Sequence, residues 1–211
     1  MPPSFWKKNQ DRLLILGVAI LCTVGVGFVL YHHWTLKEKN HYSEHQTLLD
    51  TAYRASIQSY RLAMESFFSN SINTPQVLEL FRQGVDAHGE AQDLARGRLY
   101  RHLAPIYAEM KRRNLLQLHF HEADGTSFLR FHKPESFGDA LFEVRPGVRI
   151  CNTEKRIVQG FENGRALSGF RYIFPLSLQG HHLGSVEVSV TTKAILDSLK
   201  GLDPQREYAC V

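Results

Sequence analysis

Three histidines and one arginine alternate along Leu118–Asp139, LHFHEADGTSFLRFHKPESFGD. His119 and His121 are two residues apart, and so are Arg130 and His132. Two residues is the side-chain period of a β-strand, and the Asp-Gly pair between the two halves is a strong signal for a tight hairpin turn. We therefore expect all four side chains on one face of a hairpin, where guanidinium groups could hold an anion and imidazoles could hold a metal ion.

The period of two continues beyond this hairpin, so the C-terminal half is predicted to form an antiparallel sheet. A second turn signal, Gln179-Gly180, separates the last two strands. Residues 137–155 are predicted to be irregular to helical. The predicted strands are 115–121, 127–132, 156–162, 168–178 and 183–190.

Alternation assigns each side chain to a face of this sheet. The apolar face is expected to pack on helices and contains Leu116, Leu118, Phe120, Leu129, Phe131, Phe170, Tyr172, Phe174, Val186 and Val188. The other face combines apolar residues with histidine, arginine and glutamate, and contains Gln117, His119, His121, Phe128, Arg130, His132, Arg171, Ile173, Ser185, Glu187 and Ser189.

Three interpretations of the polar face remain open. Residues 137–155 could cover it and enclose a pocket for a small anionic ligand, because arginine binds carboxylates with two parallel hydrogen bonds. Alternatively, the face could be solvated, as antiparallel sheets commonly are on one side. A third possibility is a metal site formed by His119, His121 and His132, although the 11 histidines of the chain make chance clusters expected.

The N-terminal part contains an uncharged apolar run over residues 13–31, LLILGVAILCTVGVGFVLY. About 19 apolar residues suffice to cross a hydrocarbon core of about 30 Å as a helix. Flanking aromatic residues and the lysines before the run favour an uncleaved anchor over 13–34, with a cytoplasmic tail, 1–12, and the remainder exported. A cleaved signal peptide is the alternative, and the length of the run argues against it.

Helical periodicity dominates residues 35–113. Residues 35–70 contain no glycine or proline and show an apolar stripe, which predicts a long stalk helix that packs on its own domain or on a second chain as a homodimer. A structural module that dimerises through residues 35–70 and binds no ligand is therefore a further alternative for the function. Thr74-Pro75 predicts a helix start, and a further helix is expected from Glu90 to Arg113 with a kink or restart at Pro105. Thr191 is predicted to cap a short helix that ends at Lys200.

Composition and missing motifs exclude several function classes. The net charge of +4 is scattered, which gives little support for nucleic-acid binding. No CxxC, GxSxG, HExxH, P-loop or GxGxxG motif occurs, so we expect no cofactor and no enzymatic activity. A Cys151–Cys210 disulfide is compatible with the sequence, but nothing in the sequence sets its geometry.

Three segments give the chain a family resemblance: the hairpin LHFHEADGTSFLRFHKPESFGD, then VQGFENGRALSGFRYIFPL and GHHLGSVEVSV. They resemble the Cache-type extracytoplasmic sensor domains of bacterial transmembrane receptors, in particular the double-Cache class of histidine kinases, diguanylate cyclases and chemoreceptors. The resemblance extends over most of residues 10–208. It implies a PAS-like α+β module over 114–200 that binds a small molecule and moves membrane-attached helices.

Carried over by position, the resemblance implies a set of ligand-binding residues. The amino-acid-binding pattern of better-known Cache sensors, Arg-x-Trp-Tyr with a late Tyr-x-Asp, is absent here, so amino acids are not favoured as ligands. The implied mechanism is ligand contact with Arg130, His132 and Arg171, closure of residues 137–155, and a small shift of the stalk helix. The candidates are His119, Arg130, His132, Glu162, Arg171 and Glu187, with Arg145 and Arg165 as outer possibilities.

The sequence also departs from this receptor class. Such receptors return to the membrane through a second span and end in a cytoplasmic output domain, and neither feature is seen here. Residues 201–211 are predicted to be a linker or the start of a missing second module. We therefore expect a fragment of a larger receptor or a truncated gene product.

Overall fold

The computed structural model describes residues 3–112, 115–163, 168–204 and 207–208 of the 211-residue chain. Arg165 and Cys210 lie outside these ranges, and so do the predictions made for them. The chain divides into two compact units, Met1–Thr51 and Ala52–Val211. The elements are α1 (Pro3–Phe67), η1 (Phe68–Ile72), α2 (Pro75–Val85), α3 (Glu90–Arg112), β1 (Leu115–Glu122), β2 (Ser127–Arg130), α4 (Pro146–Glu154), β3 (Val158–Glu162), β4 (Gly169–Leu178), β5 (His181–Thr191) and α5 (Thr192–Leu202).

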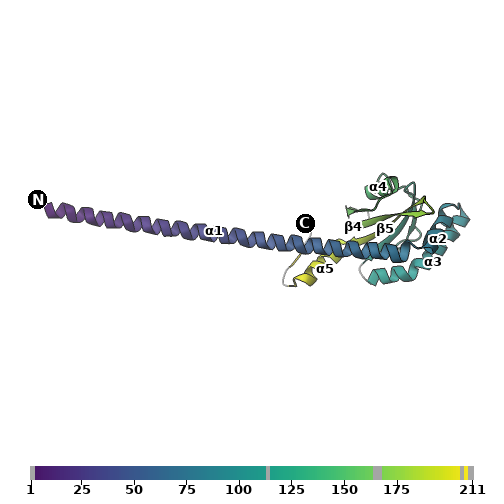
Figure 1. Cartoon of the computed structure of the whole chain (residues 1–211), viewed down its shortest axis with the longest axis horizontal. Helices are drawn as coiled ribbons and strands as arrows, with labels where there is room; N and C mark the ends of the chain where they lie inside the picture. The colour runs from purple at the N-terminus through teal and green to yellow at the C-terminus, as the bar shows by residue number, and fades with distance from the viewer. Residues whose placement is uncertain (1–2, 113–114, 164–167, 205–206, 209–211) are drawn as a thin grey trace. The chain divides into compact units, whose positions relative to one another are not determined.

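As predicted, the five strands form one antiparallel sheet (Figure 1). Their order in the sheet is β2-β1-β5-β4-β3. Gln179 and Gly180 both have positive φ, of 52° and 82°, which is the conformation of the two-residue turns that favour hairpins. Helices flank the sheet, and the fold is α+β and PAS-like. The predicted strand ranges agree with the observed ones to within two residues at each end.

The Leu116 side chain, assigned to the apolar face, lies outside the described part of the structure. Among the described side chains, one face assignment was wrong. Phe128 was expected on the polar face, but it is fully buried on the helix-covered face, where its ring packs against Phe81 at 5.2 Å between centroids. The cause is an irregularity in the β1–β2 register between Phe120 and His121, which leaves Ser127 opposite His121. Such an irregularity reverses the alternation of side chains, and a strict period of two cannot anticipate it.

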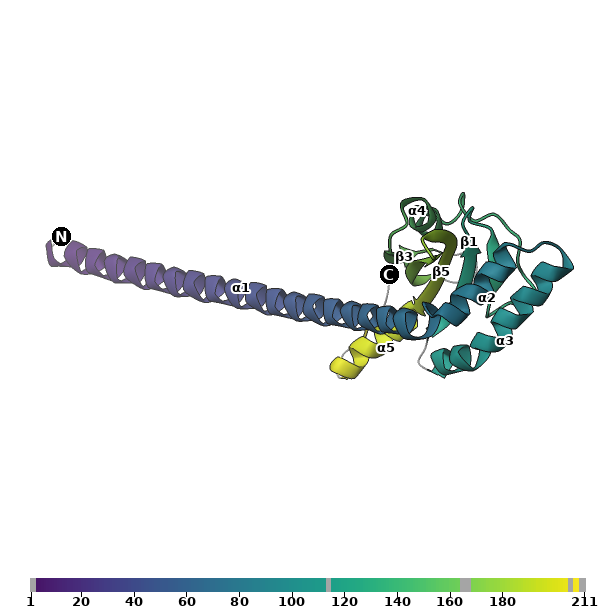
Figure 2. The same cartoon turned by 45° about the vertical axis from the view of Figure 1, so that its right-hand side comes forward.

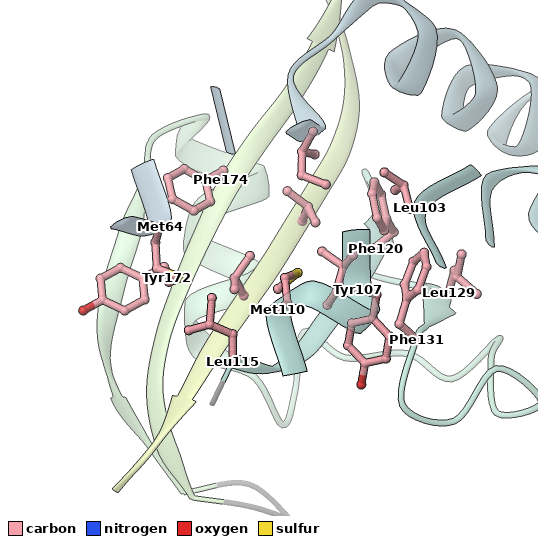
Figure 3. Close-up of a cluster of buried hydrophobic side chains, with 14 of the residues drawn as sticks. Met64, Leu103, Tyr107, Met110, Leu115, Phe120, Leu129, Phe131, Tyr172 and Phe174 are labelled. Atoms are coloured by element: carbon pink, nitrogen blue, oxygen red, sulfur yellow. The ribbon is translucent and has the colours of Figure 1, made fainter. Parts of the chain in front are cut away.

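The main hydrophobic core lies between this face of the sheet and helices α1, α2 and α3 (Figures 2 and 3). Its largest members are aromatic, and Phe68 stacks on Phe174 at 4.4 Å between ring centroids. Thr74 caps α2 by accepting a hydrogen bond from the Val77 amide at 3.3 Å, and Thr191 caps α5 in the same way, as predicted. Helix α3 continues through Pro105 without a restart.

The last turns of α1 belong to this core, so this part of the stalk packs on its own domain. Met64 is fully buried, and Tyr60 and Phe67 pack beside it. The Tyr60 hydroxyl donates to the Ala194 carbonyl oxygen at 3.2 Å, which ties α1 to α5. A second hydrogen bond ties α1 to the sheet, because the Tyr172 hydroxyl of β4 donates to the Ile57 carbonyl oxygen at 3.4 Å.

Helix α4 covers the opposite face of the sheet (Figures 1 and 2). A second, smaller hydrophobic cluster forms beneath it from Leu141, Val148, Cys151 and Ile173, which confirms Ile173 on this face. The polar side chains of the face are consequently enclosed between the sheet and α4. In the first unit, α1 includes the apolar run of residues 13–31 and is long and apolar enough to cross a membrane.

Candidate functional site

The candidate site is the polar face of the sheet beneath α4. Its side chains come from four strands, and most of them are excluded from solvent, so the alternative of a solvated outer face is wrong. Burial of this many polar groups requires partners for nearly all of them. The buried polar residues of this face are His119, His121, Ser127, Arg171, Ser185, Glu187 and Ser189, and Asn152 joins them from α4.

Two arginines and two glutamates form an ion-pair network at the centre of this face. Glu187 of β5 is fully buried, and its carboxylate binds the guanidinium groups of Arg145 and Arg171 with one oxygen each. Glu162 binds Arg145 at 3.0 Å and lies 3.7 Å from the Arg171 Nε. Arg171 also donates to the Gln117 side-chain oxygen at 2.7 Å. Burial alone would lower the pKa of Arg145, but the carboxylates of Glu187 and Glu162 outweigh it and raise this pKa.

The first turn of α4 holds the Glu162 carboxylate. The Gly147 backbone N–H donates to Glu162 Oε1 at 2.8 Å, while Arg145, the residue before the helix, donates to Oε2. A backbone N–H at a helix N-terminus and a guanidinium together favour a negative charge. A Cβ at Gly147 would lie 2.6 Å from Glu162 Oε1, so only glycine lets the carboxylate approach this closely. We call this arrangement of Arg145, Gly147 and Arg171 the anion cradle.

The two histidines of β1 are buried side by side, with their ring centroids 4.1 Å apart. His119 Nε2 shares a hydrogen bond with the Ser127 hydroxyl at 2.8 Å, and His121 Nδ1 shares one with the Ser185 hydroxyl at 3.0 Å. Burial, followed by the neighbouring positive charges, holds the pKa of each imidazole well below its usual value. Both rings are therefore neutral at neutral pH.

One nitrogen in this pair lacks a partner. Among the residues that the structure describes, His121 Nε2 is fully buried without a hydrogen bond. His119, His121 and Glu187 each offer a ligand atom, and these three atoms lie within 4.8 Å of one another. His132 is not a member of this group. His119 and His121 therefore lie beside Glu187 and not beside His132.

Arg130 and His132 occupy the margin of the site. Arg130 makes a bidentate ion pair with Asp139, at 2.7 and 2.8 Å, and donates to the Ser136 carbonyl oxygen at 2.7 Å. These bonds fix the segment that leads toward α4. His132 lies just beyond β2 and is open to solvent on one side, and partial burial of its ring, followed by the charge of Arg130, lowers its pKa.

A polar layer connects α4 to β5. The Asn152 amide donates to the Ser185 hydroxyl at 3.0 Å, and its oxygen lies 3.0 Å from His182 Nε2. Ser185 therefore joins Asn152 to His121. Beside this layer, burial raises the pKa of the Cys151 thiol to about 12, which makes it an inert packing residue.

The structure brings together His119, Glu162, Arg171 and Glu187 of the predicted ligand-binding residues, with Arg130 and His132 at the margin. Arg145, expected as an outer possibility, lies at the centre of the network. Gly147 was not among the predicted ligand-binding residues, although its N–H binds Glu162. The triplet Arg145-Pro146-Gly147 held the signal, because proline is favoured at the first position of a helix and marks the turn whose N–H groups are free.

A family model described as the double sensory domain of two-component sensor kinases, dCache_3, matches residues 42–201. No functionally curated relative matches the sequence. Among solved structures, the ligand-binding domain of the Campylobacter jejuni chemoreceptor Tlp3, in complex with 4-methylisoleucine, superposes with a TM-score of 0.53 at 11% identity. That match covers 69% of this chain and 57% of the Tlp3 chain, so the chain spans little more than half of that domain.

The sensor domain of the histidine kinase DctB from V. cholerae is also similar. It matches with a TM-score of 0.48 at 17% identity, and the match covers 74% of this chain and 61% of that one. The match to Tlp3, at 11% identity and a TM-score of 0.53, indicates a shared fold alone and does not identify a ligand of this chain.

Proposed function

The chain belongs to the family of double sensory domains of two-component sensor kinases, and from this premise we propose that it senses a small anionic molecule outside the cytoplasm for a membrane-anchored bacterial receptor. The supporting observation is the anion cradle beneath α4. There, two arginines and a helix N-terminus converge on one carboxylate, that of Glu162.

Glu162 occupies the place that a ligand carboxylate would take. It is the last residue of β3, an edge strand of the sheet, and its side chain is 20% exposed, whereas Glu187 behind it is fully buried. An incoming anion would therefore meet Glu162 first. In this proposal the ligand replaces Glu162 on Arg145 and the Gly147 N–H, while Glu187 keeps both arginines oriented.

Displacement of Glu162 would loosen the connection between β3 and α4. The strand retains its pairing with β4, but the link from Glu162 to the first turn of α4 is lost. The ligand can move this equilibrium only by as much as its affinities for the two states differ. Arg130 in this scheme positions the segment before α4, and its predicted direct contact with ligand stays a prediction.

The signal would leave the site through β4 and α1. Arg171 is part of the anion cradle, and Tyr172, the next residue, contacts Ile57 of α1 on the other face of the sheet. Because α1 also includes the apolar run of residues 13–31, we propose that this run anchors the chain in the cytoplasmic membrane, with the N-terminus inside.

Residues 35–51 of α1 are proposed to pair with a second chain. Tyr42 and Leu48 are 65% and 61% exposed, an unusual state for large apolar side chains on a helix with an apolar stripe. Disulfide formation between Tyr42→Cys residues of two chains, in a protein whose native cysteines are replaced by serine, tests this. Absence of any cross-linked dimer in membranes would contradict the pairing.

A thermal-shift screen of the full chain in detergent against organic acids, phosphates, amines and nucleobases tests the ligand class. A ligand at about 100 times its dissociation constant adds roughly 2.7 kcal/mol of stability, which raises the melting temperature by several degrees. The proposal expects a carboxylate or phosphate hit that is lost in Arg145→Gln. Hits confined to amines, or a hit unchanged in Arg145→Gln, would reject the anion cradle as the binding site.

A further inference from the structure

The strongest unexplained feature outside the anion cradle is the free nitrogen of His121. A fully buried imidazole nitrogen without a partner costs stability, so native structures seldom leave one unused. Its neighbours include the second histidine and an oxygen of Glu187, and all three ligand atoms lie within 4.8 Å. Two imidazoles and one carboxylate are a recognised donor set for zinc, with a fourth position open.

We infer that His119, His121 and Glu187 bind one divalent transition-metal ion, with zinc as the best match. The ligand atoms of a tetrahedral zinc site lie about 3.3 Å apart, because each bond is about 2.0 to 2.2 Å long. Each of the three ligand atoms therefore has to move by roughly 1 Å toward the ion. This inference stands on the histidine pair and does not require the proposed ligand.

The surroundings of the histidines are those of oriented metal ligands. His121 Nδ1 bonds to the Ser185 hydroxyl at 3.0 Å, and Asn152 holds that hydroxyl in turn at 3.0 Å. His119 Nε2 bonds to Ser127 at 2.8 Å. Hydrogen bonds of this kind fix the tautomer and the ring orientation of a metal-binding histidine.

Glu187 already binds Arg145 and Arg171, but a carboxylate has about four lone-pair sites, so each oxygen can accept more than one partner. The arginines also keep other partners: Arg145 retains Glu162, and Arg171 retains Gln117. The charges of these two arginines and two glutamates cancel. A dication therefore adds positive charge to a neutral cluster, and we expect the open fourth position to take a hydroxide or another anion.

The test is zinc binding by the full chain, purified in detergent through a tag without histidine and stripped with a chelator. Equilibrium dialysis against zinc ions followed by metal analysis is expected to give one ion per chain. His121→Ala should abolish this binding, and Ser185→Ala should weaken it about tenfold by releasing the ring. His88→Ala is the matched control, because His88 is exposed between α2 and α3 and lies outside the metal-binding group, so it should leave binding unchanged.

His121→Ala could also lose zinc by unfolding, so a second measurement uses the unchanged protein. X-ray absorption at the zinc edge should show two imidazole nitrogens, at about 2.0 to 2.1 Å, together with oxygen ligands. A different ligand set would overturn the inference, as would the absence of bound zinc. Zinc retained in His121→Ala but lost in a variant of the His41–His45 pair, whose rings lie 4.0 Å apart on α1, would overturn it too.

Discussion

Arg171 and Tyr172 are consecutive residues of β4 that contact different parts of the molecule on opposite faces of the sheet. The Arg171 guanidinium binds Glu187 and approaches Glu162 in the anion cradle, while the Tyr172 hydroxyl donates to the Ile57 carbonyl oxygen of α1. Side chains alternate along a strand, so one peptide unit connects the two contacts. Displacement of Glu162 from Arg171 by a ligand therefore has a short mechanical route to α1.

Replacement of Tyr172 by phenylalanine should interrupt this route. The variant loses the hydrogen bond to Ile57 but keeps the ring in the core, so ligand affinity should not change. In the unchanged protein, ligand binding is expected to alter amide hydrogen exchange over residues 52–67 of α1. The same response measured in Tyr172→Phe should be smaller. An undiminished response would show that coupling takes another path, such as the contact of Tyr60 with α5.

Loss of the Glu187 charge should destabilise the sensor domain strongly. Glu187→Gln leaves two buried arginines with one carboxylate, and breaking a buried ion pair costs about 3 to 5 kcal/mol. We expect the melting temperature to fall by about 10 °C. Glu79→Gln is the matched control, because Glu79 pairs with Arg82 on the surface and should have little effect. Equal effects in the two variants would contradict the central place given to Glu187.

Two glycine-to-alanine changes on helices should act in opposite directions. A Cβ at Gly84 of α2 would lie 2.3 Å from the Phe128 ring, so Gly84→Ala should overpack the core and cost about 1 to 3 kcal/mol. A Cβ at Gly97 of α3 would have its nearest contact at 3.6 Å, so Gly97→Ala should stabilise by up to about 1 kcal/mol through helix propensity. Melting curves of both variants decide this, and a stabilised Gly84→Ala would contradict the packing of Phe128.

The Cys151 thiol should be unreactive in the folded protein. With its pKa raised to about 12 by burial, only about one molecule in ten thousand holds a thiolate at pH 8. Unfolding returns the pKa to about 8.5, where roughly a quarter is thiolate. In a Cys22→Ser, Cys210→Ser background, a thiol reagent should label Cys151 only after denaturant is added. Rapid labelling of the native protein would show that α4 opens readily.

Much of this architecture was predictable from the sequence, for local reasons. Thr74 and Thr191 indicated the starts of α2 and α5. Two glycine-containing turns predicted the two hairpins. Alternation placed His119, Arg171 and Glu187 on one face of the sheet correctly. These signals depend on neighbouring residues alone, which is why a single sequence reveals them.

The remaining features depend on contacts between distant segments. Phe128 changed face because of a register irregularity that no residue pattern announces. Arg145 and Glu162 are 17 residues apart in the sequence, and they pair because α4 packs against β3. The sequence likewise grouped three histidines, whereas the fold replaced His132 by Glu187 from the neighbouring strand.

Glu162 is proposed to fill the place of an anionic ligand. Isothermal titration of the first anionic hit against the full chain and two variants tests it most directly. Glu162→Gln removes the internal competitor, so affinity should rise about tenfold, a gain of roughly 1.4 kcal/mol. Arg145→Gln removes the guanidinium and should abolish measurable binding. Affinity that falls in Glu162→Gln, or survives in Arg145→Gln, would contradict the account.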